Sequence, residues 1–192
     1  MRLLHIITSL EIGGAQRLLS DLLPLQRKYG YEIKLLVFKH VDNTFSRCIS
    51  KCGIDIICIN CDNYYSISNV NKLTHIIKDF DIVHVHLFPT LYWAALAVLN
   101  CNNVKLVYTE HSTHNKRRDR WYFRPIEKYI YGKYNKIISI SQQTQSNLTK
   151  WLDANVNDSR FVVIENGINI ESFNLSLPLR SKKQIIMVSR FA

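Results

Sequence analysis

The chain has 192 residues, of which 47% are hydrophobic and 21% are charged, with only 6 Gly and 4 Pro. This composition is typical of a globular domain with one core, and it excludes a disordered, collagen-like or low-complexity chain. Lys and Arg together number 25 against 15 Asp and Glu, and the resulting net charge of +10 favours anionic partners such as nucleic acid, an acidic membrane surface or phosphorylated metabolites.

Short apolar segments rich in Ile, Val and Leu predict seven β-strands, at 2–8, 32–38, 55–59, 82–87, 104–109, 136–140 and 161–164. They are apolar on both faces, as in a parallel sheet that helices cover on both sides. A helix is predicted after Gly13-Gly14, and Pro24 should kink or shorten it. Further helices are predicted at 44–51, 67–79, 91–100, 121–134 and 141–152. Ser141 is the predicted N-cap of the last one. The alternation predicts an α/β fold, a Rossmann-like doubly wound parallel sheet.

The domain organisation changes after the turn signal Asn166-Gly167. Residues 1–167 are predicted to form the Rossmann-like domain, and 168–183, which has no helical or strand period, is interpreted as an interdomain linker. The apolar run at 184–192 then predicts the first strand of a second domain that is missing from this chain.

Two motifs lie near the carboxyl ends of predicted strands. One is a glycine pair after the first strand, and the other is a pair of histidines in the fourth. Gly13 and Gly14 open a helix, where the backbone can approach a ligand and free N–H groups favour an anion, although a tight turn alone also requires glycine. His84 and His86 share one face of a strand near the carboxyl end, where ligands bind in open α/β sheets. A packing role for at least one imidazole is the alternative, and no third metal ligand is indicated.

A third polar motif, YTEHSTH, ends the fifth predicted strand and contains Glu110 and His111. It could orient a sugar or a phosphate, and an exposed polar loop is the alternative. The next segment, 115–136, carries eight basic and two acidic residues interleaved with aromatics. Such a segment suits an anionic lipid headgroup layer and, less well, single-stranded nucleic acid, while a solvated helix face is the alternative.

The five cysteines are odd in number, and four of them lie close together in the sequence. This pattern indicates a reducing cytosol rather than a disulfide framework. Cys58 and Cys61 invite a zinc interpretation, but Cys58 lies inside an apolar run, so the thiols are expected to be small buried hydrophobes. No apolar run reaches the ~18 residues of a membrane span, and polar residues interrupt the opening apolar stretch that a secretory signal would need.

Taken in order, these segments resemble the amino-terminal domain of family 4 glycosyltransferases, the retaining GT-B group that builds bacterial capsules, lipopolysaccharides and glycolipids. LHIITSLEIGGAQRLLSDLL is similar to the family's opening strand, glycine loop and first helix. DIVHVHLF, YTEHS, KIISISQQTQSNL and FVVIENGIN are similar to its successive strand and loop signatures, and IIMVSRFA to the strand that opens its donor-binding domain. Glu165, Asn169 and Ser189 depart from the usual proline, aspartate and glycine.

The resemblance implies a set of residue roles. His111 would be the catalytic imidazole beside the donor sugar, and Gly13, Gly14 and Arg190 would contact the donor. With these roles we expect Gln16 on the donor side and His86, Glu110, Arg117 and Arg118 on the acceptor side, where the two arginines meet acidic headgroups or phosphates. The resemblance also implies a UDP- or GDP-linked sugar as donor, no cofactor or obligatory metal, and no nucleic acid. The acceptor would be lipid-linked or a polysaccharide, at the cytoplasmic, inner face of the cell membrane.

The chain ends before the lysine and the paired glutamates that the family carries in its donor-binding half. The resemblance therefore implies the acceptor-side domain alone, inactive by itself and completed by a carboxyl-terminal donor domain. Two alternatives stay open. One is a non-catalytic or split-enzyme module that binds acceptor or membrane, and the other is half of a GT-B nucleotide-sugar epimerase.

Overall fold

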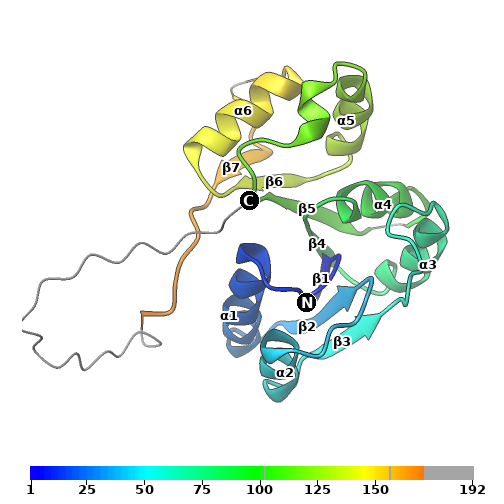
Figure 1. Cartoon of the computed structure of the whole chain (residues 1–192), viewed down its shortest axis with the longest axis vertical. Helices are drawn as coiled ribbons and strands as arrows, with labels where there is room; N and C mark the ends of the chain where they lie inside the picture. The colour runs from blue at the N-terminus through cyan, green and yellow to red at the C-terminus, as the bar shows by residue number, and fades with distance from the viewer. Residues whose placement is uncertain (102, 156, 171–192) are drawn as a thin grey trace, which may run out of the picture.

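The computed structural model describes residues 1–101, 103–155 and 157–170. Within them, one parallel sheet contains seven strands, which are β1 (Arg2–Ile7), β2 (Glu32–Val37), β3 (Asp55–Cys58), β4 (Ile82–His86), β5 (Lys105–Glu110), β6 (Lys136–Ser139) and β7 (Phe161–Val163). Their order across the sheet is β3-β2-β1-β4-β5-β6-β7 (Figure 1). The predicted strands and the Rossmann-like fold class are confirmed.

Helices connect successive strands. They are α1 (Gly14–Lys28), α2 (Thr44–Lys51), α3 (Ser68–Ile77), α4 (Thr90–Ala97), α5 (Phe123–Tyr131) and α6 (Gln142–Leu152), with 3-10 turns η1 (Val98–Asn100) and η2 (Lys116–Asp119). Ser141 caps α6 as predicted, since its hydroxyl accepts the Thr144 N–H at 3.2 Å. Pro24 does not end α1, which continues to Lys28 while Leu19 and Leu23 anchor it in the core, and the expected kink stays a prediction.

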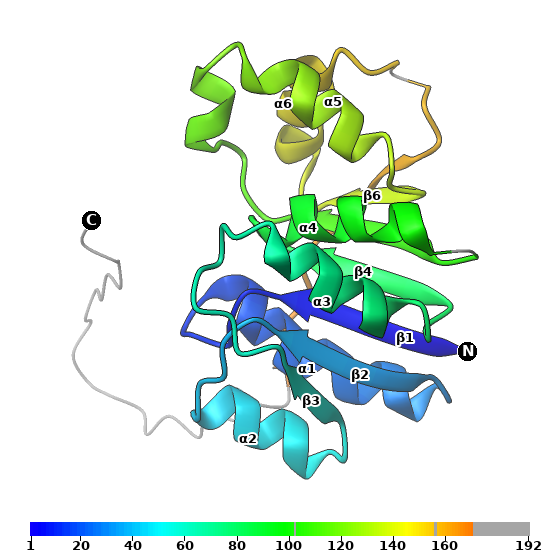
Figure 2. The ribbon, with the colours of Figure 1, turned by 90° about the vertical axis from the view of Figure 1, so that its right-hand side faces the viewer.

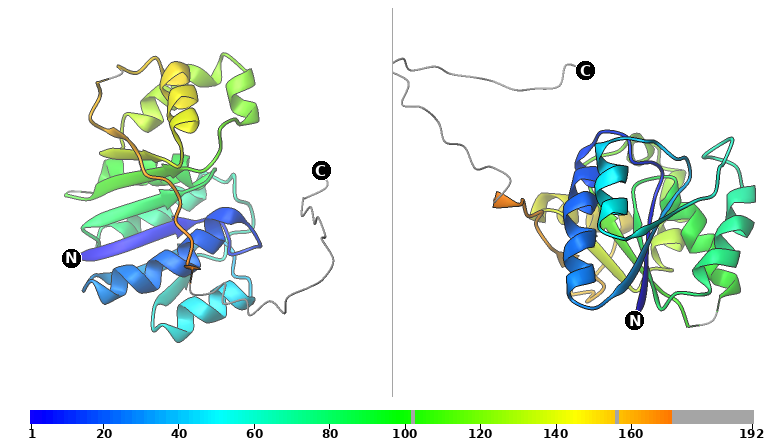
Figure 3. Two further views of the ribbon diagram at one scale, coloured as in Figure 1. Left: turned by 90° about the vertical axis from the view of Figure 1, so that its left-hand side faces the viewer. Right: turned by 90° about the horizontal axis from the view of Figure 1, so that it is seen from below.

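The sheet separates two apolar cores. α1 and α2 lie on one side of it and α3 and α4 on the other, as the view from below shows (Figure 3). Leu4 and Ile6 of β1 join the core beneath α3 and α4, while Leu3 and Ile7 join the core beneath α1 and α2. Because side chains alternate along a strand, the intervening His5 faces α1. α5 and α6 stand together at the β6–β7 end of the sheet (Figure 2).

The strand order reverses between β1 and β4. From β1 the chain adds β2 and β3 on one side and later β4 to β7 on the other. In open α/β sheets, ligands bind outside the carboxyl ends of the strands at such a switch point. The ends of β1, β4 and β5 therefore define the place where a functional site is expected.

Part of the predicted domain organisation lies outside the described residues. This holds for the predicted linker from residue 171 onward, for the predicted strand at 184–192 and for Arg190 within it. Among the helices that the structure describes, none has the length and apolar character needed to cross a bilayer.

Candidate functional site

Four histidines gather at the switch point. The β1–β4 register pairs His5 with His84, and the two-residue period of β4 places His86 on the same face. His111 directly follows β5. The ring centroids of His84 and His86 are 4.3 Å apart, those of His5 and His84 4.9 Å, and those of His86 and His111 5.4 Å. The prediction that His84 and His86 point the same way is thus confirmed, and His5 joins them.

Hydrogen bonds join three of these rings into a chain. His5 Nε2 lies 2.9 Å from Oε1 of Gln26 on α1, and His5 Nδ1 lies 3.1 Å from His86 Nε2. His86 Nδ1 lies 3.1 Å from His111 Nε2. His84 stands beside this chain and pairs through Nε2 with the Thr109 hydroxyl at 2.7 Å. The buried imidazoles are therefore satisfied by protein partners.

Burial keeps these imidazoles neutral. Desolvation lowers the pKa of His5 and of His111 from 6.5 to about 4. For His84 and His86 the pKa lies well below 6.5, first because of burial and second because of repulsion from the neighbouring rings. At neutral pH each ring therefore offers one N–H donor and one acceptor nitrogen.

The same cluster could in principle hold a metal ion. His5, His84 and His86 each offer one ring nitrogen, and these three atoms lie within 4.8 Å of one another. The sequence did not indicate His5 as a third ligand, because 79 residues separate it from His84 and only the parallel register brings them together. A cation here would have to replace the 3.1 Å hydrogen bond between His5 and His86. The expectation of a metal-free site stays a prediction.

Glu110 ends β5 next to the histidines and is almost fully buried. Its carboxylate accepts hydrogen bonds from Arg118 Nη2 at 2.6 Å, from the Tyr131 hydroxyl at 3.0 Å and from the Ser112 N–H at 3.3 Å. Burial raises the pKa of Glu110, and the Arg118 guanidinium opposes that rise. Glu110 is thus a structural carboxylate held below the loop surface.

Glu127 of α5 forms a second buried ion pair. Its carboxylate accepts from Arg117 Nε at 2.7 Å, from the Tyr92 hydroxyl at 3.1 Å and from Trp151 Nε1 at 2.7 Å. The Arg117 guanidinium also lies over the Phe88 ring, 3.9 Å from its centroid.

This arrangement corrects the expected surface role of two arginines. The side chains of Arg117 and Arg118 are only 15% and 6% exposed, and each is paired with a buried glutamate. A carboxylate can be buried in charged form only beside a cation, so each arginine balances the charge of a buried glutamate instead of standing at the surface. The predicted place of Arg117 and Arg118 on the acceptor side stays a prediction. Other members of the same segment do face solvent, and they include Lys116, Arg120, Trp121, Tyr122 and Tyr129.

The glycine loop leads from β1 into α1. Gly13 is the N-cap of α1, and a Cβ there would lie 2.5 Å from Gln16 Oε1, so a larger residue would displace the end of the Gln16 side chain. Gln16 is buried and donates from Nε2 to the Ser9 carbonyl at 3.2 Å, which braces the loop. The proposed contact of these residues with a donor stays a prediction, and Gly14, where an added Cβ would meet nothing within 4 Å, leaves room beside the helix start.

The cysteines are not the buried hydrophobes that the sequence suggested. All five are free thiols, with Cys48 and Cys52 exposed and the other three half-buried. Cys48 and Cys52 lie four residues apart at the end of α2, whose buried face carries Ser46 and Ile49 instead. The helix period, which the sequence spacing alone did not settle, turns these thiols to solvent.

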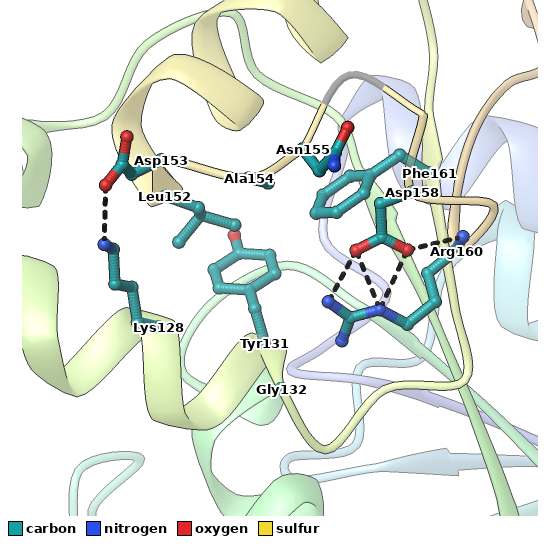
Figure 4. A pocket seen from close by; sticks show the side chains of 10 residues that line it. All are labelled: Lys128, Tyr131, Gly132, Leu152, Asp153, Ala154, Asn155, Asp158, Arg160 and Phe161. Atoms are coloured by element: carbon teal, nitrogen blue, oxygen red, sulfur yellow. Dashed lines mark hydrogen bonds and ion pairs between the residues drawn. The ribbon is translucent and has the colours of Figure 1, made fainter.

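A cavity of about 320 Å³ lies elsewhere, between α5, α6 and the start of β7 (Figure 4). Its charged lining residues are already paired, Lys128 with Asp153 at 3.2 Å and Arg160 with Asp158 at 2.7 Å. No residue singled out from the sequence as catalytic or binding lines it. Geometry and chemistry together therefore favour the switch point as the site.

The chain was matched to known proteins at the levels of sequence and fold. A family model described as Glycosyltransferase Family 4 matches residues 12–172. No curated protein matches the sequence.

Solved structures with a similar fold include these three. Anabaena Alr3699/HepE, in complex with UDP and glucose, is 19% identical with a TM-score of 0.70, over 89% of this chain and 46% of that one. A glycosyltransferase from Rickettsia africae ESF-5 is 24% identical with a TM-score of 0.69, over 90% and 45%. The lipopolysaccharide outer core galactosyltransferase WaaB, in its apo form, is 12% identical with a TM-score of 0.65, over 95% and 50%. The chain thus spans about half the length of these proteins.

Proposed function

Because this chain belongs to glycosyltransferase family 4, we propose that it is the acceptor-side domain of a retaining glycosyltransferase that uses a nucleotide sugar. The donor is a UDP- or GDP-linked sugar, and the acceptor is a lipid-linked or polysaccharide intermediate of cell-surface polysaccharide, lipopolysaccharide or glycolipid synthesis. The observation that carries the proposal is the group of neutral imidazoles at the carboxyl ends of β1, β4 and β5, in a chain of this family.

The donor-binding part of the proposal draws on the solved relatives. Anabaena Alr3699/HepE is described with UDP and glucose and with UDP-glucose. Since the chain covers about half of that protein, we place most donor contacts in a second domain beyond residues 1–192. From this chain, the backbone at Gly13 and Gly14 would face the diphosphate, whose developing charge needs N–H donors and cations as it leaves. Transfer would then need no cofactor and no obligatory metal.

His111 is the proposed catalytic residue. It follows β5 at the switch point and is partly exposed, while His86 behind it is fully buried. Because burial lowers its pKa to about 4, His111 is a neutral hydrogen-bonding group rather than a cation at neutral pH. A neutral imidazole can orient a sugar hydroxyl beside the reacting carbon without repelling a partly positive transition state. His86 supports His111, and Glu110 holds the loop that carries it.

The membrane part of the proposal rests on exposed basic and aromatic residues of one segment, which are Lys116, Arg120, Trp121, Tyr122 and Tyr129. Trp121 is 82% exposed and Tyr129 is 52% exposed, and both lie in the segment that carries eight basic residues. Basic heads with interfacial aromatics suit an anionic headgroup layer. We therefore place the protein at the inner face of the cytoplasmic membrane, bound peripherally.

The experiment is glycosyl transfer by the full-length protein with radiolabelled UDP- and GDP-sugars and a membrane lipid extract as acceptor source. We expect His111→Ala to lower kcat at least about a hundredfold while the protein stays folded, as circular dichroism would show. The matched control is His114→Ala, because His114 is an exposed histidine in the same loop. Transfer by His111→Ala at the wild-type rate would contradict the catalytic role.

The two alternatives give different results in the same assay. A binding module would retain lipid or acceptor with no transfer even at full length, and copurification of a separate donor-binding chain would indicate a split enzyme. An epimerase would convert a free nucleotide sugar with no acceptor present. The family match favours transfer over epimerisation.

A further inference from the structure

A continuous hydrogen-bonded chain joins helix α1 to the proposed reaction centre. It runs from Gln26 through His5 and His86 to His111, and we call it the histidine chain. Its three links measure 2.9, 3.1 and 3.1 Å. Its two central rings, His5 and His86, are fully buried, so water does not replace either partner. The donor or acceptor role of the group at one end of the histidine chain therefore determines the role of the ring at the other end.

The direction of the protons along this chain follows from counting donors. Gln26 contributes its amide oxygen, which only accepts, so His5 must carry its proton on Nε2. His5 Nδ1 is then an acceptor, and His86 must carry its proton on Nε2 to donate to it. His86 Nδ1 in turn accepts, so the proton of His111 lies on Nε2. Each ring is neutral and holds one proton, so no other order satisfies all three links with this oxygen as anchor.

We propose that Gln26 is a positioning residue that sets the tautomer of His111 through His5 and His86, leaving His111 Nδ1 as an acceptor for a hydroxyl of the substrate. The identity of that hydroxyl as a sugar hydroxyl rests on the proposed function, whereas the proton order itself does not. A reversed chain, anchored by a donor at position 26, would present an N–H to the substrate at His111 instead.

The scaffold holds this order in place. His5 and His86 lie on adjacent, hydrogen-bonded strands, and the backbone carbonyl of Gln26 accepts N–H groups from Tyr29 and Tyr31 at the end of α1. Reversing the order requires three protons to change nitrogen and the anchor to become a donor. A buried group that fixes an imidazole tautomer acts on the rate without touching the substrate, as the aspartate of a Ser-His-Asp triad does.

The direct test is the tautomer of each ring in the full-length protein, read at about pH 8 by long-range ¹H–¹⁵N correlation with ring-labelled histidine. In the wild type we expect His5, His86 and His111 all to be protonated at Nε2. Gln26→Glu keeps an acceptor and should preserve this pattern. Gln26→Met removes the anchor and should give His111 a mixture of both tautomers. Gln143→Met, at an exposed glutamine of α6, is the matched control and should change nothing.

Several outcomes would overturn the proposal. His111 protonated at Nδ1 in the wild type would show the opposite proton order, and this reading needs no variant to fold. An unchanged His111 tautomer in Gln26→Met would show that Gln26 does not set it. A zinc-type cation bound by His5 Nδ1 and His86 Nε2 would move the His86 proton to Nδ1, and spectra with and without a chelator would reveal it.

A kinetic measurement separates this inference from the proposed function. In a transferring full-length enzyme, Gln26→Met should lower kcat about tenfold or more with little change in KM, and Gln26→Glu should restore most of it. Expected tautomers without any glycosyl transfer would contradict the proposed function alone. Transfer that Gln26→Met leaves unaffected, with tautomers unmoved, would contradict this inference alone.

Discussion

Two buried polar clusters occupy neighbouring strand ends and avoid the cost of desolvated charge in opposite ways. The histidine cluster of His5, His84, His86 and His111 is neutral, because burial lowers each pKa. The ion-pair cluster, formed by Arg117 with Glu127 and Arg118 with Glu110, keeps its charges and matches them at 2.7 and 2.6 Å. The histidine cluster avoids charge by staying deprotonated, whereas the ion-pair cluster places each charge beside an opposite one.

The difference suits the two clusters to different roles: the histidine cluster to binding or catalysis, and the ion-pair cluster to holding the structure in place. Each neutral imidazole offers one donor and one acceptor nitrogen, so the histidine cluster can hydrogen-bond to a ligand. A buried ion pair has fixed partners, and breaking it leaves a charge without solvent. The ion-pair cluster ties η2 to β5 and α5 and thereby fixes the loop after β5, while the proposed reacting group belongs to the histidine cluster.

The largest expected effect is a loss of stability on acidification. An unfolded histidine takes up a proton near pH 6.5, whereas His5 and His111 in the folded protein do so at about pH 4. The contribution of these neutral histidines to the free energy of unfolding is therefore complete above pH 6.5, and it is lost as the pH falls from 6.5 towards 4. Between pH 7 and 5.5 we expect each of the four histidines to contribute about 1 kcal/mol, so the free energy of unfolding should fall by about 4 kcal/mol.

Urea unfolding at a series of pH values measures this slope. Glu110 works in the opposite direction because burial raises its pKa, but one carboxyl cannot reverse the effect of four imidazoles. His111→Gln should make the slope shallower, because it removes one of the four buried imidazoles. A free energy of unfolding that is flat between pH 7 and 5.5 would contradict the neutral cluster.

The second effect comes from breaking the ion pair of Glu127, whose carboxylate is fully buried. Glu127→Gln removes the charge that Arg117 faces and should lower the free energy of unfolding by about 3 kcal/mol. Replacing both partners with apolar residues, as in Arg117→Met with Glu127→Leu, should cost less than the single change. Asp55→Asn, which breaks the exposed pair with Lys34, serves as the control and should cost at most about 0.5 kcal/mol.

A smaller loss of stability is expected when Glu110 loses its arginine, because this carboxylate can take up a proton. Arg118→Met should cost about 2 kcal/mol, because Glu110 keeps its Tyr131 and Ser112 donors and its pKa can rise further. Infrared spectroscopy should then show one new protonated carboxyl at neutral pH, which Glu110→Gln in the same background would remove. A loss as large as that of Glu127→Gln, with no protonated carboxyl, would show that the two pairs behave alike.

The smallest effect concerns a single neutral hydrogen bond. Thr109→Val keeps the side-chain shape but removes the hydroxyl that pairs with His84 Nε2, and it should cost about 1 kcal/mol. Thr113→Val, at an exposed loop position, is the control for the threonine-to-valine change. If both variants unfolded at the same urea concentration as the wild type, His84 would need no partner in its buried position.

The sheet could be predicted because buried parallel strands are apolar on both faces, and this signal is local. Each of the seven strands predicted between residues 2 and 164 agrees with the structure to within one residue at its ends. Pro24 shows the limit of local rules, since one missing hydrogen bond did not outweigh the burial of Leu19 and Leu23. The cysteine expectation failed for a similar reason, because burial depends on which face of α2 meets the sheet.

The sequence by itself determined the strand–helix alternation, the family and the place of His86, Glu110 and His111 at strand ends. Only the tertiary structure decided that His5 and Gln26 belong with them, because parallel pairing joins residues that are far apart in the chain. It also decided that Arg117 and Arg118 serve buried glutamates instead of a surface. The sequence gives the type and charge of each residue, but the partner of a charged side chain depends on which side chains are buried together when the protein folds.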